Sequence, residues 1–299
     1  MPARYLQRPS PIYFIGDSFT LVFRDRVYLD GGTPPHAHIG RSMYVDHFRL
    51  REFTRPDGSL HPAIAQALDS EHLTVPTEKG GITAYHTTTD VRWRHVAVAD
   101  GRLRRPPTMV FLAGHLDLVE YGMLVGKNVT VELPADCRPA PLPTPEGTQV
   151  IPLSVSLPAF EEFFRPLVAG LRSLQGLGFS RMFVHSMQPP PVDDEVLQRN
   201  DLADTYTACR YAGMVLFNYV LAKMCADVGV QFLDVWDAQT QNGVLRPDLA
   251  HVDRVHLNER AALITMEHLF DALAAGAAEP AASASKRCSI VISAARSLR

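Results

Sequence analysis

The stretch Tyr13-Phe14-Ile15-Gly16-Asp17-Ser18-Phe19 runs from apolar residues through Gly-Asp-Ser into a helix-like segment. A short apolar run bounded by turn residues is typical of a buried strand. Ser18 then falls at a strand-to-helix turn, where backbone N–H groups are free to hold an anion. The stretch therefore predicts the first strand of an α/β protein, with a hydroxyl group at its carboxyl end.

Further apolar runs alternate with helical patterns along the chain, which predicts an α/β fold with a mainly parallel sheet. Ligands of such folds bind at the carboxyl ends of the strands. The predicted strands are Tyr13–Ile15, Ala37–Ile39, Met109–Ala113, Met182–His185 and Phe232–Val235. The predicted helices are Phe19–Tyr28, Pro62–Leu68, Ala159–Leu174, Asp204–Val228 and Glu259–Ala274.

Length and composition limit the classes of function. The chain has 299 residues, is 46% hydrophobic and carries a formal charge of -3, so nothing favours binding to nucleic acid or to an anionic membrane. The 4 cysteines form no C-x-x-C pair, which argues against a disulfide scaffold or zinc ribbon. No signal-peptide pattern and no stretch of ~20 apolar residues is present, so we expect a cytoplasmic protein without a membrane partner.

Most of the chain is expected to form one domain, over residues 1–275. The Pro-rich segment 134–152 predicts an excursion or lid rather than a linker. The Ala/Ser-rich residues 276–299 predict a flexible tail.

Serine chemistry is the first functional hypothesis. Asp253-Arg254-Val255-His256 is an Asp-x-x-His near the other end of the chain and can complete a Ser-His-Asp set with Ser18. The three-residue spacing places Asp253 and His256 on one face of a turn, so that the carboxylate can orient the imidazole. A serine needs such a base to become nucleophilic. The alternative for Ser18 alone is an N-cap.

A metal site is the minor alternative. His251-x-Asp253-x-x-His256 and His36-x-His38 hold possible ligands, but no His-Glu-x-x-His helix is present. No Gly-rich phosphate loop occurs either. We therefore expect no cofactor.

Gly16-Asp17-Ser18 near the start and Asp253-x-x-His256 near the end resemble the SGNH (GDSL-type) hydrolase superfamily. The order of elements from Tyr13 to Leu269 is similar as well. The resemblance implies a three-layer α/β/α, flavodoxin-like domain. It also implies that Ser18 is the nucleophile, His256 the general base and Asp253 the residue that orients the base.

The same resemblance implies an oxyanion hole built from the Ser18 N–H, a glycine N–H after the second strand and an asparagine side chain. Gly40 corresponds to the glycine, although a structural turn glycine is an equal alternative. The third block departs from the superfamily pattern, because Gly114-His115-Leu116-Asp117 has leucine where the asparagine is expected. His115 is the candidate replacement donor. Alternatively, His115 and Asp117 form a structural pair.

Four residues are expected to contact the substrate, namely Asp17, Arg41, Asp117 and His185. Arg41 could bind a carboxylate, phosphate or sulfate, or could be a solvated surface arginine. His185 ends a predicted strand and could also be a satisfied core histidine.

These residues predict an esterase or acyltransferase that acts on a small acyl ester of a polar metabolite or glycan. Two alternatives stay open. One is a repurposed member of the fold in specialised metabolism without esterase activity, which the altered third block suggests. The other is a non-catalytic binding subunit that works with a partner enzyme.

Overall fold

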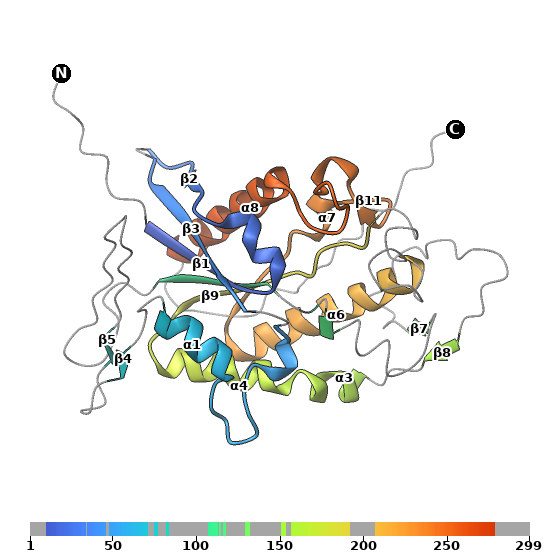
Figure 1. Cartoon of the computed structure of the whole chain (residues 1–299), viewed down its shortest axis with the longest axis horizontal. Coiled ribbons are helices and arrows are strands. Elements are labelled where there is room, and N and C mark those ends of the chain that lie inside the picture. The colour runs from blue at the N-terminus through green and yellow to red at the C-terminus, as the bar shows by residue number, and fades with distance from the viewer. Residues whose placement is uncertain are drawn as a thin grey trace.

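The computed structural model describes residues 10–33, 35–45, 48–70, 75–76, 82–83, 107–112, 114, 116–117, 129–131, 151–153, 157–191 and 207–278. In this part of the chain a central sheet lies between two layers of helices (Figure 1). The predicted three-layer α/β/α class with a mainly parallel sheet is confirmed.

The central sheet has 6 strands in the order β10-β9-β6-β1-β3-β2. Their bounds are β1 Ser10–Gly16, β2 Val27–Leu29, β3 Ala37–Tyr44, β6 Thr108–Leu112, β9 Arg181–His185 and β10 Gln231–Leu233. Every neighbouring pair is parallel except β2 with β3, which is antiparallel. Each predicted strand is present, so their carboxyl ends meet at one edge of the sheet, as a site in this fold requires.

Alternate side chains of each strand pack into the cores on the two faces of the sheet. In β1, Tyr13 and Ile15 pack into the larger core cluster, whereas Ile12 and Phe14 pack into the cluster that contains Met266 of the last helix. A parallel strand covered on both faces has no polar side, which explains the continuous apolar runs in the sequence.

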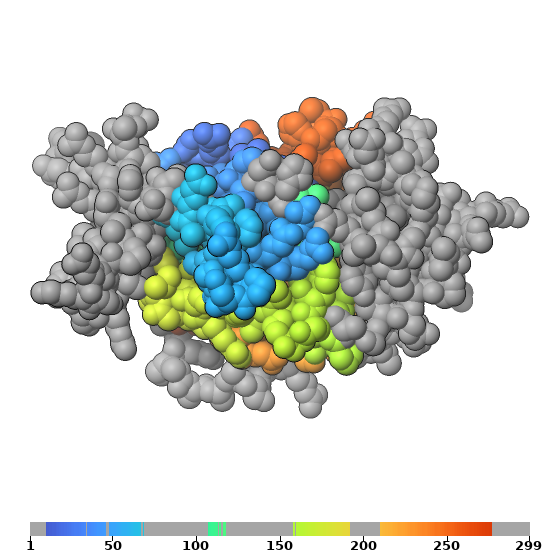
Figure 2. Space-filling model, turned by 60° about the horizontal axis from the view of Figure 1, so that its bottom comes forward, coloured from blue at the N-terminus to red at the C-terminus, as the bar shows by residue number. Residues whose placement is uncertain are grey.

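Helices α1 Pro62–Ser70, α3 Leu157–Phe163, α4 Arg165–Gly176 and α6 Thr207–Val228 cover one face of the sheet. Figure 2 is turned toward this layer and shows the α1 segment beside the α3–α4 segment. Helix α8, Glu259–Ala278, packs on the opposite face. The shorter elements are η1 Ser18–Phe23, η2 Leu50–Glu52, α7 Trp236–Gln239 and η4 Pro247–Leu249. Two-stranded pairs are formed by β4 Val75–Pro76 with β5 Ile82–Thr83, β7 Val129–Val131 with β8 Ile151–Leu153, and β11 Thr240–Gln241 with β12 Val244–Leu245.

Two helix predictions were wrong in part. The predicted helix Phe19–Tyr28 is a 3₁₀ turn that ends at Phe23, after which the left-handed Asp25 (φ 56°) turns the chain into β2. The predicted helix Ala159–Leu174 is two helices, α3 and α4. They separate at Phe164, because Pro166 opens the second helix and has no N–H for a continuous ladder.

Other boundaries are only partly covered. Helix α8 continues to Ala278, so residues 276–278 of the predicted tail are helical. The rest of that tail lies outside the described residues, as does the Pro-rich segment 134–152 apart from the first residues of β8.

Candidate active site

The structure brings Ser18, His256 and Asp253 into one hydrogen-bonded chain. Ser18 is the first residue of η1, one residue beyond the end of β1, and the two partners lie in the loop between η4 and α8. The distance from Ser18 Oγ to His256 Nε2 is 2.8 Å. The distance from His256 Nδ1 to Asp253 Oδ2 is 2.7 Å. Both contacts are within the range of a good hydrogen bond.

Asp253 also organises the loop that carries it. Its Oδ1 accepts the backbone N–H groups of Val255 and His256, each at 2.9 Å. Between them Arg254 adopts a left-handed conformation (φ 60°), which turns the chain back on the carboxylate. Partial burial alone would raise the pKa of Asp253, but these hydrogen bonds and the imidazole contact lower it to about 2. The residue is therefore a carboxylate at any ordinary working pH.

A second imidazole adjoins the same carboxylate. His251 Nδ1 lies 3.4 Å from Asp253 Oδ2, and the backbone N–H of His251 donates to the backbone carbonyl of His256 at 2.7 Å. On its other side, the His256 ring lies against the ring of Phe19, with centroids 5.0 Å apart. The side chain of His256 keeps 37% of its surface exposed, so the base faces solvent on one side.

Asp17 fixes the start of η1. Its Oδ1 accepts the Phe19 N–H at 3.0 Å, which makes it the N-cap of this turn. The residue is only 4% exposed. Burial raises the pKa of Asp17 to about 7, against the effect of the Phe19 hydrogen bond, and the negative charge of Asp117 adds to the rise. The predicted contact with substrate is replaced by a capping role beside the serine.

Replacing Asp17 by asparagine should stabilise the fold at alkaline pH, because asparagine keeps the capping oxygen without a buried charge. The folded state holds the Asp17 proton up to about pH 7, whereas an unfolded aspartate loses it near 3.8. Stability therefore falls as pH rises between these values. We expect Asp17→Asn to gain roughly 2–4 kcal/mol at pH 8 and almost nothing at pH 4.

Urea unfolding at both pH values measures this gain. The control is Asp271→Asn, an exposed carboxylate on α8. An equal effect of Asp17→Asn at the two pH values would contradict the burial argument.

Gly40 does not supply an oxyanion donor, and that prediction was wrong. Gly40 lies inside β3, and its N–H donates to the Arg26 carbonyl at 2.8 Å. A Cβ atom at this position would lie 2.2 Å from the Phe23 carbonyl oxygen. Glycine is required here because the chain after η1 passes directly over β3.

Two of the predicted substrate contacts have protein partners instead. Arg41 forms an ion pair with Asp25, and its side chain is 13% exposed. Asp117 is fully buried, and its oxygens accept the N–H groups of Leu50 at 2.8 Å and Arg51 at 3.1 Å. Burial raises the pKa of Asp117 to about 6 despite these bonds. The prediction that Asp117 contacts the substrate is therefore wrong, because it caps η2.

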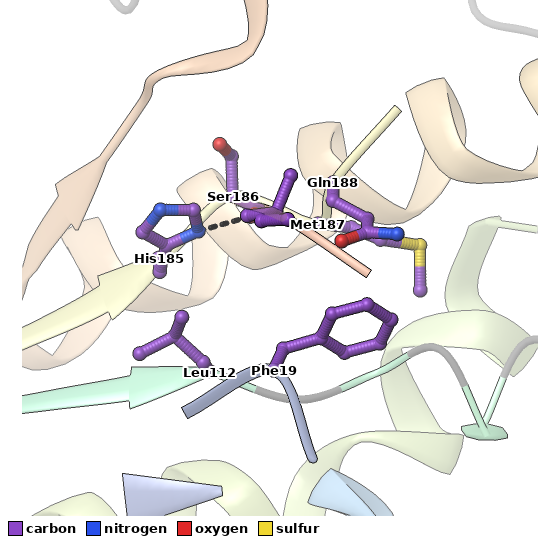
Figure 3. Close-up of a pocket in the computed structure, with 7 residues that line it drawn as sticks. Phe19, Leu112, His185, Ser186, Met187 and Gln188 are labelled. Carbon is purple, nitrogen blue, oxygen red and sulfur yellow. Dashed lines mark hydrogen bonds between the residues drawn. The ribbon is translucent and has the colours of Figure 1, made fainter. Parts of the chain in front are cut away.

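His185 lies in the wall of a cavity at the carboxyl ends of the strands (Figure 3). It is buried, and its ring nitrogens contact the Ser186 carbonyl and, at 3.1 Å, Thr265 Oγ1. Burial lowers the pKa of His185 to about 4, so the ring is neutral at physiological pH. Of the two readings of this residue, the satisfied core histidine matches these contacts. His115, the predicted third oxyanion donor, lies outside the described residues.

Sequence reasoning missed Gln188 and Phe19, which also line this cavity. Each follows a residue that was singled out, Gln188 after the β9 end at His185 and Phe19 after Ser18. Their position after strand ends was the available signal.

The described residues contain no group of three or more His, Cys, Asp or Glu side chains placed to hold a metal ion. His38 of the possible His36-x-His38 pair contacts Asp30 at 3.3 Å instead. Within the same part of the chain, no helix is long and apolar enough to span a bilayer.

Comparison with known proteins found no matching family model and no matching curated protein. Solved structures do match. They include a putative SGNH hydrolase and a GDSL-like lipase. Another is an acetyl xylan esterase with a TM-score of 0.42 and 14% identity, over 88% of this chain and 99% of the other.

The GDSL-like lipase is from Bacteroides thetaiotaomicron, and a further match is the lipase/acylhydrolase from Enterococcus faecalis. For the first, the TM-score is 0.41 and the identity 14%, over 90% of this chain and 89% of the other. For the second, the TM-score is 0.38 and the identity 12%, over 92% of this chain and 100% of the other. The identities and TM-scores of these matches are too low to assign an activity to this chain.

Proposed function

We propose that the protein is a serine hydrolase of SGNH type that cleaves a small acyl ester of a polar metabolite or glycan. The observation that carries the proposal is the continuous contact from Ser18 Oγ through His256 to Asp253, at 2.8 Å and 2.7 Å. A hydroxyl, a base and a carboxylate in this order have the geometry of nucleophilic catalysis.

In the proposed reaction, Ser18 Oγ attacks the ester carbonyl carbon while His256 Nε2 takes the hydroxyl proton. The carbonyl electron pair moves to oxygen and returns as the bond to the alcohol breaks. His256 gives its proton to the departing alcohol, which leaves an acyl group on Ser18. Water, or another alcohol in a transferase, then attacks that acyl group with His256 again as the base.

Among the oxyanion donors expected from the sequence, the Ser18 N–H remains available at the first position of η1. Gly40 donates to Arg26, and leucine stands at 116 in place of an amide side chain. Each missing donor typically costs an oxyanion site ~10²–10³ in kcat. The missing donors are the observation that supports a second candidate function. In it, the protein is a member of the fold that uses the pocket for chemistry other than ester cleavage.

Labelling with a fluorophosphonate tests the proposal. The wild-type protein should acquire one phosphonyl group on Ser18, seen by intact mass and peptide mapping, because the probe needs an activated serine and no natural substrate. Ser18→Ala should not react, and the matched control Ser59→Ala, at an exposed turn, should react as the wild type does. A folded wild-type protein that stays unlabelled would overturn the proposal in favour of the second candidate.

A further inference from the structure

A cavity is lined in part by the residues that follow Ser18 and His256 in the sequence, which are Phe19 and Leu257. The space inside it that can take the centre of a water molecule is about 20 Å³, which limits an occupant to a short group. In Figure 3, Phe19 and Leu112 form one wall and the segment from His185 to Gln188 forms the other.

The lining is mostly apolar, with Phe19, Leu112, Met187 and Leu257. Two of the polar side chains already have protein partners. His185 uses both ring nitrogens, and Ser186 Oγ accepts the Val235 N–H at 3.1 Å. The third, Gln188, is 6% exposed, and its Oε1 has no hydrogen-bond partner among the described residues.

The orientation of the Gln188 amide follows from its other contact. Gln188 Nε2 donates to the Val255 carbonyl at 2.6 Å. A carbonyl oxygen can only accept, so the nitrogen has to face Val255 and the oxygen has to take the other position. That position is on the cavity side of the side chain (Figure 3).

We propose that this cavity binds the acyl part of the ester, an inference that rests on the proposed function. Gln188 Oε1 then accepts a hydrogen bond from a hydroxyl or N–H group on that acyl part. A buried acceptor without a partner is costly, and a ligand that supplies the donor removes the cost. The substrate class is thus a short hydroxyacyl or N-acylated aminoacyl ester rather than a plain alkanoyl ester.

The acyl part is assigned to the cavity because the alcohol part can leave on the solvent-exposed side of His256. His256, which protonates the departing alcohol, is 37% exposed on its side chain. A large polar alcohol can therefore stay in solvent while the smaller acyl part enters the cavity beside Phe19.

The test compares 4-nitrophenyl 3-hydroxybutyrate with 4-nitrophenyl butyrate. These esters share a chain length and differ by one donor. For each ester, kcat/KM is divided by its rate constant with hydroxide, which removes the difference in intrinsic reactivity. We expect the wild type to favour the hydroxyacyl ester by about 10-fold, and Gln188→Met to lower that preference by about the same factor.

Gln239→Met is the matched control. Gln239 is also a fully buried amide whose Oε1 has no partner among the described residues, but it does not line the cavity. This variant should keep the wild-type preference. If Gln188→Met does not fold, the wild-type preference alone is decisive.

A wild type that is labelled by fluorophosphonate but shows no preference for the hydroxyacyl ester would overturn the inference and leave the proposed function intact. So would a labelled protein that cleaves neither ester, or an unchanged preference in folded Gln188→Met. A protein that is not labelled at all would overturn the proposed function, and the inference with it.

Discussion

Asp253→Asn should lower kcat for ester cleavage by about 10⁴ at neutral pH, with a much smaller change in KM. The reason is the tautomer of His256. Oδ1 of residue 253 accepts the N–H groups of Val255 and His256, so the asparagine oxygen has to stay there. The new amide nitrogen then replaces Oδ2 and faces His256 Nδ1, which is 2.7 Å from Oδ2 in the wild type. Two N–H donors cannot share that contact.

The imidazole consequently carries its proton on Nε2 and cannot accept the proton of Ser18. Steady-state kinetics with a 4-nitrophenyl ester and the rate of fluorophosphonate labelling should fall together, while the thermal midpoint changes little. Asp237→Asn, a carboxylate on the nearby α7, is the control and should stay near wild-type activity. A loss below 10-fold in Asp253→Asn would show that the carboxylate does not set the tautomer.

Gly40→Ala should destabilise the protein by about 3 kcal/mol or more, which lowers the thermal midpoint by at least roughly 5 °C. The added Cβ would lie 2.2 Å from a backbone oxygen, that of Phe23. Neither Gly40 nor Phe23 can move away easily. The Gly40 N–H donates to the Arg26 carbonyl, and the Gly40 carbonyl accepts the Asp25 N–H. The Phe23 ring stacks on the Phe14 ring, with centroids 3.9 Å apart.

Gly31→Ala is the matched control, since a Cβ atom there meets nothing within 4 Å. It should leave the thermal midpoint almost unchanged. Gly40→Ala also separates the two roles considered for Gly40. Alanine keeps the backbone N–H, so an oxyanion donor would survive the substitution, whereas the close packing would not. A stable Gly40→Ala protein would contradict the packing role.

The sheet was predictable because a buried parallel strand has to be apolar on both faces. Runs such as Met109–Ala113 carry that requirement in their composition alone. The Ser18, Asp253 and His256 set was predictable for a different reason. Asp253 and His256 are three residues apart in sequence, and with the serine after the first strand they complete a Ser-His-Asp set.

The errors come from contacts between distant segments. The sequence cannot reveal that the chain after Phe23 folds back over β3, and this contact turns Gly40 from a free turn glycine into a packed one. Asp117 was predicted to be a site residue because it ends the Gly114-His115-Leu116-Asp117 block. Its carboxylate binds the backbone at Leu50 and Arg51, across a separation that no local pattern encodes.

The exposed side of His256 bears on the second half of the proposed reaction. The acyl group on Ser18 is removed by whichever hydroxyl compound reaches Nε2 first, and 37% of this side chain lies open to the surroundings. Bulk water is always present at that opening, whereas a competing alcohol has to be bound and held there. A base placed in this way makes water the default acceptor, so release of the free acid should prevail over transfer to another alcohol.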